Sequence, residues 1–183
     1  MSNFLKVLIM IICVNLIVIP LIGEELVLRS DQLEVELIDD MKKGVASGNV
    51  TITFKDIVVS SPRANYKYTD KSKEIHLFEG VKIKQKDITV TCKEVYAYGH
   101  KKKLVLKKEV LFNYDNINII SEKADYDMQK QNITFLGTPM IKQGEDFIQS
   151  DFISVNLKTK KVLSKGNTKL KVSTEKLKIL DKN

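Results

Sequence analysis

Apolar and polar residues alternate with a period of two along most of the chain after residue 25. This period is typical of β-strands with one buried face, and no stretch after residue 23 shows the period of 3.6 that a helix requires. Six related segments carry the pattern, at 26–35, 57–66, 88–97, 117–126, 147–155 and 170–179. Each contains one small residue, in order Ser30, Ser61, Cys92, Ser121, Ser150 and Thr174. The spacing predicts a repeat of about 30 residues.

In each segment the apolar residues change sides after the small residue. A straight strand cannot do this, because a shift of one residue turns every side chain to the other face. We therefore expect a bulge or corner directly after each small residue. The expected corners are at 31–32, 62–63, 93–94, 122–123, 151–152 and 175–176.

A second set of strand-like segments lies between the first, at 45–54, 75–83, 104–114, 133–141 and 162–170. Glycine inside a strand marks a bend or a close backbone approach. Four of these segments have such a glycine near the middle, and Glu109 replaces it in the fifth; the glycines are Gly48, Gly80, Gly137 and Gly166. Both sets of strands are therefore expected to bend at the same level.

Short polar turns join the segments, which favours antiparallel hairpins. The predicted fold is all-β: an open antiparallel trough of V-shaped section, built from about eleven bent strands, with the apolar positions of both legs facing inward. The residues expected to line this groove are Phe54, Val59, Ile83, Val90, Phe112, Ile119, Phe135 and Ile148. Small residues at the corners are expected to leave room inside it.

Residues 1–23 differ from the rest of the chain. Lys6 precedes an apolar run that ends near Pro20, and Gly23 is followed by two glutamates. This pattern predicts a secretory signal peptide cleaved after Gly23, with a retained N-terminal anchor as the alternative. The domain expected for the fold is 24–183. Removal of 1–23 would leave Cys92 as the one cysteine, so no internal disulfide is expected.

Composition argues against several classes of function. The chain has 183 residues, two histidines, two cysteines and a net charge of +7. His76 and His100 are isolated, and no converging acid, base or nucleophile is visible, so we expect no enzyme, no metal site and no cofactor. Many lysines gather at one set of turns, where they either keep the turns soluble or meet anionic lipid head groups. Without interleaved aromatic residues, they do not predict nucleic-acid binding.

The repeated phrases resemble the OstA/LptA type of lipopolysaccharide transport protein. The resemblance rests on Leu28, Ser30, Asp31 and Leu33, on residues 48–52, on Ala64 and Tyr66, and on residues 124–127. It implies a periplasmic β-jellyroll whose apolar interior carries lipopolysaccharide or a related acylated glycolipid from the inner to the outer membrane. It also implies head-to-tail assembly with related jellyroll proteins.

Two other functions remain open from the sequence. One is a jellyroll of the LptC type, which keeps its N-terminal anchor, and the other is a structural envelope repeat protein whose own side chains fill its interior. For assembly, the expected edge strands are 25–37, which is acidic, and 168–180, which is basic. Opposite charges favour contact between unlike ends, either with related proteins or in a homo-oligomer.

Overall fold

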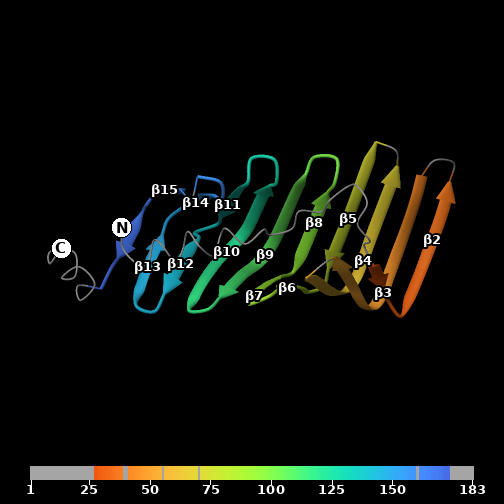
Figure 1. The fold of residues 1–183 in the computed structure, drawn as a ribbon, viewed down its shortest axis with the longest axis horizontal. Helices are drawn as coiled ribbons and strands as arrows, with labels where there is room; N and C mark the ends of the chain where they lie inside the picture. The colour runs from red at the N-terminus through yellow and green to blue at the C-terminus, as the bar shows by residue number, and fades with distance from the viewer. Residues whose placement is uncertain (1–26, 39–40, 55, 70, 160, 174–183) are drawn as a thin grey trace.

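The computed structural model describes residues 27–38, 41–54, 56–69, 71–159 and 161–173. Within these ranges the chain forms sixteen strands of one antiparallel sheet and no helix. The strands lie side by side along the long axis of the molecule (Figure 1). The prediction of an all-β antiparallel fold is therefore confirmed, whereas the expectations for the signal segment 1–23 fall outside the described residues.

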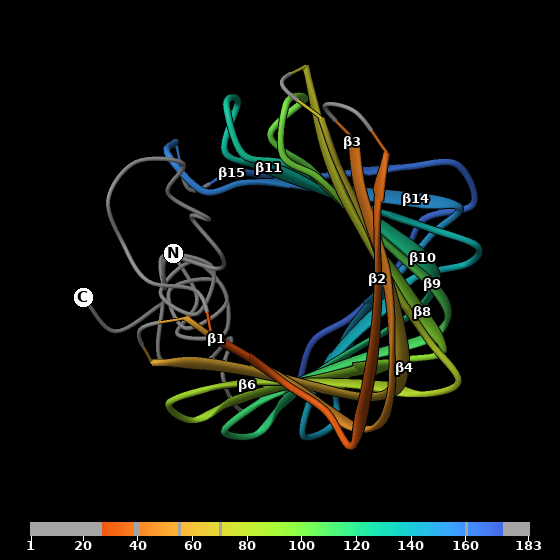
Figure 2. The same cartoon turned by 90° about the vertical axis from the view of Figure 1, so that its right-hand side faces the viewer.

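The sheet is folded into two legs around one interior (Figure 2). Four strands run unbroken through both legs: β3 (Met41–Phe54), β4 (Ile57–Thr69), β9 (Lys103–Tyr114) and β10 (Ile117–Asp127). The upper leg adds β2 (Gln32–Ile38), β5 (Ser72–Phe78), β8 (Glu94–Tyr98), β11 (Asn132–Leu136), β14 (Phe152–Asn156) and β15 (Lys161–Lys165). The lower leg adds β1 (Val27–Arg29), β6 (Val81–Gln85), β7 (Ile88–Cys92), β12 (Met140–Gln143), β13 (Asp146–Gln149) and β16 (Lys169–Lys171).

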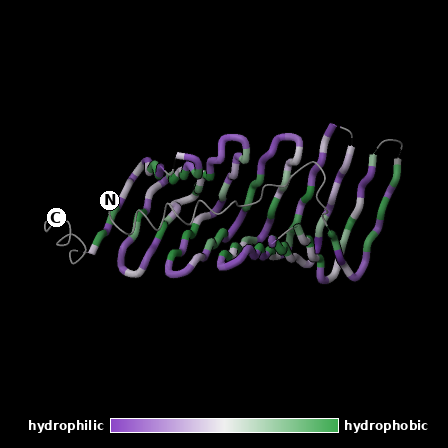
Figure 3. The backbone as a smooth tube through the Cα atoms, in the orientation of Figure 1, coloured by the Kyte–Doolittle hydropathy of each residue, from purple (hydrophilic) through white to green (hydrophobic). Residues whose placement is uncertain are grey.

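The two legs meet at a corner that every bent strand crosses. The small-residue strand has one residue at the corner, Pro62 in β4 or Glu122 in β10, where its neighbour has two, so the register shifts by one and the extra residue lies on the neighbouring strand. The buried side chains of β4 nevertheless change sides between Ser61 and Ala64. The predicted change of side is thus present. Hydrophobic and hydrophilic residues alternate along both legs (Figure 3), and the hydrophobic side faces the interior in each.

The neighbouring strands cross the corner with two residues in the left-handed region. In β3 these are Gly48 (φ 71°) and Asn49 (φ 48°), and the same two-residue step recurs at 79–80, 108–109, 137–138 and 166–167. Glu109 is the second residue of its left-handed step, as Gly80 is, and so takes the place of a glycine at that position. The first position beside it is Lys108, so this corner contains no glycine.

Side chains reinforce the corner. The Ser30 hydroxyl donates to the backbone oxygen of Gln32 (2.9 Å), and Ser61 and Ser150 do the same two residues on. The Cys92 thiol takes this place at 3.3 Å from the oxygen of Glu94. At these four corners the small residue is therefore a hydrogen-bond donor as well as a space-saving side chain, whereas the buried Ser121 hydroxyl has no such partner among the described residues.

The end of the sheet differs from the expectation of an eleventh bent strand over 170–179. Four unbroken strands and six broken pairs make ten bent strands in the described part of the chain. Residues 169–171 form β16, the second half of the strand that bends at Gly166, and pair with β13. The sixth repeat thus begins inside an existing strand, and its remainder lies outside the described residues.

The corner at Lys108 and Glu109 yields a prediction on stability. A non-glycine residue in the left-handed region costs about 1–2 kcal/mol of stability, and substitution by glycine removes this cost. Glycine also increases the conformational entropy of the unfolded chain, which offsets part of the gain. Urea unfolding should show Glu109→Gly to be about 0.5–1 kcal/mol more stable than the matched variant Glu109→Ala. Both lose the ion pair with Lys93 (3.1 Å), so the comparison isolates the backbone. Equal stabilities would show that the corner is unstrained.

Cys92 supplies a second prediction. Burial raises the pKa of its thiol to about 11, so almost no thiolate exists at pH 8. In a chain beginning at residue 24, iodoacetamide should label Cys92 at least about tenfold more slowly in the native state than in urea. Cys92→Ser should keep the corner hydrogen bond and unfold within about 1 kcal/mol of the parent, whereas rapid native labelling would mean that the corner opens freely.

Candidate functional site

The inner face of the lower leg carries one continuous row of apolar side chains. Cross-strand pairing connects ten residues from the first strand to the last: Leu28, Ile52, Val59, Ile83, Val90, Phe112, Ile119, Ile141, Ile148 and Leu170. The row runs along the long axis, because the backbone hydrogen bonds of a sheet lie perpendicular to its strands. Ten strands with one apolar side chain each make an unbroken apolar track.

All eight residues expected to line the groove face this interior. Six belong to the lower row just described, Phe54 lies in the neighbouring lower row, and Phe135 lies opposite in the upper leg. All are buried except Val59 and Ile148, which are half-buried and pack against the core. The structure therefore brings the predicted groove residues together, while their binding of lipid stays a prediction.

The interior between the legs is largely filled. Two hollows remain there, with volumes of about 40 and 60 Å³, and almost all of their lining is apolar. Each has room for one or two groups the size of a water molecule. Hollows of this size do not hold an acyl chain, so the small corner residues leave less room than expected, and binding a chain between the legs would require the side chains or the legs to move.

The apolar inner surface is open at both ends of the sheet. On β2 the inward side chains of Leu33, Val35 and Leu37 are 52%, 51% and 69% exposed, and Leu170 on β16 is 60% exposed. β1 and β2 form the edge at the front, and β15 and β16 form the edge at the back. The predicted edge segments are thus edges, apart from residues 25–26 and 174–180, which lie outside the described part of the chain.

Polar side chains interrupt the inner face at the lip of the lower leg, which the sequence analysis missed. Gln85 and Gln143 are only 6% and 8% exposed and occupy inward positions next to apolar residues. The Gln143 amide donates to Asn116 Oδ1 (3.0 Å), and Gln85 donates to the Asp56 carboxylate at 3.3 Å. Both glutamines continue the alternation of inward positions at the ends of their strands. The sequence analysis missed them because it counted only apolar residues as inward.

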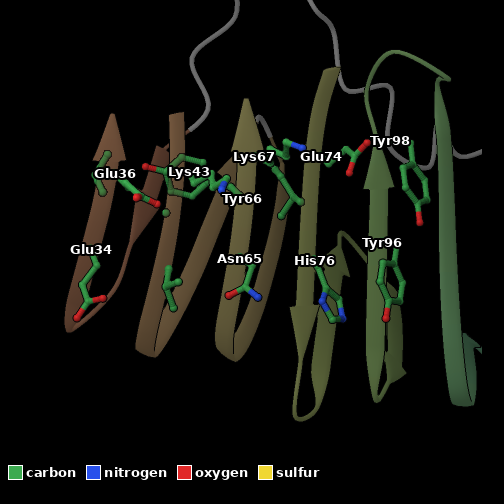
Figure 4. A pocket seen from close by; sticks show the side chains of 14 residues that line it. Glu34, Glu36, Lys43, Asn65, Tyr66, Lys67, Glu74, His76, Tyr96 and Tyr98 are labelled. Carbon is green, nitrogen blue, oxygen red and sulfur yellow. The ribbon is translucent and has the colours of Figure 1, made fainter. Parts of the chain in front are cut away.

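A separate groove of about 710 Å³ lies on the outer face of the upper leg (Figure 4). His76 and Tyr96 stack there with ring centroids 4.0 Å apart, and Lys107 Nζ lies 4.4 Å from the Tyr96 ring. Hydrogen bonds from Lys108 and Tyr96 lower the pKa of Glu94, while burial lowers the pKa of His76. The ring stack leaves these aromatic faces covered, and the groove assembles no nucleophile with a base.

The described residues also bear on metal sites and on membrane-spanning helices. No group of three His, Cys, Asp or Glu side chains within them could hold a metal ion. Within the same ranges there is no helix of the length and hydrophobicity needed to span a membrane.

Comparison with known proteins places this geometry in a family. The fold is similar to the crystal structure of LptH from Pseudomonas aeruginosa, described as the LptA homologous periplasmic component of the conserved lipopolysaccharide transport device. The two share 13% identity with a TM-score of 0.51, over 82% of this chain and 96% of that one, which supports the likeness of fold. No curated protein matches the sequence. The model of the family described as OstA-like protein matches residues 24–181, so the chain belongs to the OstA-like protein family, as its OstA/LptA resemblance predicted.

Proposed function

We propose that this protein is a periplasmic lipid carrier that holds the acyl chains of lipopolysaccharide or a related glycolipid between its two legs and passes them from the inner toward the outer membrane. The observation that carries the proposal is the row of ten apolar residues that reaches both ends of the sheet. A closed core would need no apolar inner surface at its ends, yet Leu37 and Leu170 are exposed there. Membership in the OstA-like family supports the same function.

The structure offers a physical route for the legs to open. The described backbone pairings connect neighbouring strands along each leg, so the two inner faces meet through side chains. Moving the legs apart would exchange contacts between apolar side chains for contacts with an acyl chain. Such an exchange keeps apolar surface away from water and costs little free energy.

One observation favours a second candidate function. The small hollows, about 40 and 60 Å³, agree with a structural envelope repeat protein whose interior is filled by its own side chains. That candidate explains the packed core but gives no reason for apolar inner surfaces at the two ends. An LptC-like protein would share the trough and differ in keeping residues 1–23 as an anchor.

Photo-crosslinking distinguishes the two candidates. A benzophenone amino acid at Ile119 or Phe135, which face the interior, should label purified lipopolysaccharide. The same group at Thr134, which precedes Phe135 and lies on the outer face, or at Lys102 in a turn should label little. Labelling at all four positions alike, or at none, would contradict interior binding and favour the structural protein.

Assembly through unlike edges is the second part of the proposal. The front edge carries Glu34 and Glu36, and the back edge carries Lys165, Lys169 and Lys171. An added strand would pair β2 of one molecule with β15 of the next and join their apolar tracks. The partner is a related jellyroll protein or a second copy of this chain.

Cysteine crosslinking tests this contact. In a Cys92→Ser background, Glu34→Cys and Leu163→Cys variants mixed in equal amounts should form a disulfide-linked pair between unlike ends. Each variant alone serves as the control and should remain unlinked at the same concentration. Disulfides between like ends only, or none in the mixture, would refute front-to-back contact.

A further inference from the structure

The outer face of the lower leg has a charge distribution that the lipid trough does not explain. We call the outward-facing strand positions of this leg the lower outer face. It carries six cationic residues and, among the described strand positions, no aspartate or glutamate. The cations are Arg29, Lys82, Lys84, Lys142, Lys169 and Lys171.

The outer face of the upper leg is different. It holds the outward acidic residues of the described strands other than Glu109 and Glu122, which stand at the corner; these are Glu34, Glu36, Glu74, Glu94, Asp125 and Asp127. Its lysines are interleaved with these carboxylates, and some pair with them, as Lys108 does with Glu94 and Lys123 with Asp125. The sheet therefore separates a mixed outer face from a cationic one, although both derive from the same repeat.

The lower outer face also exposes apolar side chains. Ile120 is 52% exposed, with Leu111 and Met140 as its direct cross-strand neighbours. Phe147 lies on the next strand, between its cross-strand neighbours Lys142 and Lys171. Val58, 39% exposed, pairs with Lys84 farther along the leg. A contiguous apolar strip with lysines on both sides is typical of a surface that meets a partner, whereas single exposed apolar residues are common on any protein surface.

Carboxylates near this face stand at its edge. Asp56, Asp87, Asp115 and Glu145 lie in the turns at the lip of the lower leg, and Asp31, Glu79, Glu109, Glu122 and Asp151 lie along the corner at its other border. Glu145 forms an ion pair with Lys171 (3.2 Å), and Asp56 accepts hydrogen bonds from the buried Gln85. Lys82, Lys84 and Lys142 take part in no ion pair between described residues, so their charges remain available to a ligand.

We propose that the lower outer face binds the surface of an anionic lipid bilayer. The lysines would contact lipid phosphates, and Ile120 with its apolar neighbours would enter the head-group layer. Each lysine near an anionic membrane strengthens binding by about fivefold. Nucleic acid fits less well, because Phe147 is the one aromatic ring on the described part of this face, and Lys169 Nζ lies 5.5 Å from its centroid.

This inference does not depend on lipid in the trough. Docking through the lower outer face would lay the long axis of the sheet along a membrane, with the interior beside the bilayer rather than facing it (Figure 2). It therefore adds a contact with the membrane surface to a protein proposed to carry single lipids.

Vesicle flotation tests the proposal with residues 24–183, which contain every described strand. The protein should float with vesicles of 30% phosphatidylglycerol and 70% phosphatidylcholine, and far less with phosphatidylcholine alone. Lys82→Glu/Lys84→Glu should weaken this binding by at least about tenfold. The matched control Lys43→Glu/Lys67→Glu makes the same change in net charge on the upper outer face and should weaken it by less than about threefold.

Further measurements separate the two components of binding. Ile120→Asn should weaken vesicle binding by about three- to tenfold while leaving its salt dependence unchanged, because it removes apolar contact and no charge. Circular dichroism would confirm that each variant is folded. Equal losses in the two double variants would show a net-charge effect and overturn the proposal. If a 30-nucleotide single-stranded DNA displaced the vesicles from the lower outer face, the result would overturn the proposal and favour nucleic acid as the ligand.

Discussion

The corner between the two legs is the constraint on which the rest of the structure depends. A strand exposes alternate side chains to opposite faces, so a strand whose inward positions change parity needs an irregularity where it bends. The small-residue strands change parity, as from Ser61 to Ala64 in β4, whereas their neighbours keep it, as from Ala46 to Val50 in β3. One corner residue of the small-residue strand faces a two-residue left-handed step on its neighbour, as Pro62 and Glu122 do, and this mismatch accomplishes the change. Without it, one leg would present its polar face to the interior.

The chemistry of the corner follows from that geometry. Gly48 leaves space for Asp31, whose carboxylate accepts a hydrogen bond from Asn49 Nδ2 (2.9 Å). Asp151 and Asn167 repeat this contact at the other end of the sheet (3.0 Å). The aspartate, glycine and asparagine of the phrases that carry the family resemblance thus make corner contacts that support the fold. Leu28 and Ile52, from the same phrases, lie in the apolar row of the lower leg.

Because the corner directs apolar residues to one interior on both legs, the molecule has three surfaces with separate properties. The interior is an apolar track that continues to both edges, and the upper outer face mixes charges of both signs. The lower outer face is cationic with an apolar strip around Ile120. A lipid carrier needs the first surface, and contact with a membrane would use the third.

The sequence by itself determined the strands, the corners and the eight inward positions, because parity and the small residue of each repeat are local properties of the chain. It missed Gln85 and Gln143, whose polarity hid their inward parity, and it did not show that Lys108 shares the left-handed step with Glu109. Only the tertiary structure decided how closely the legs pack, and hence the volume left inside. It also decided which charges share an outer face, since that depends on which leg and which cross-strand neighbours each residue acquires, and these are long-range consequences of register.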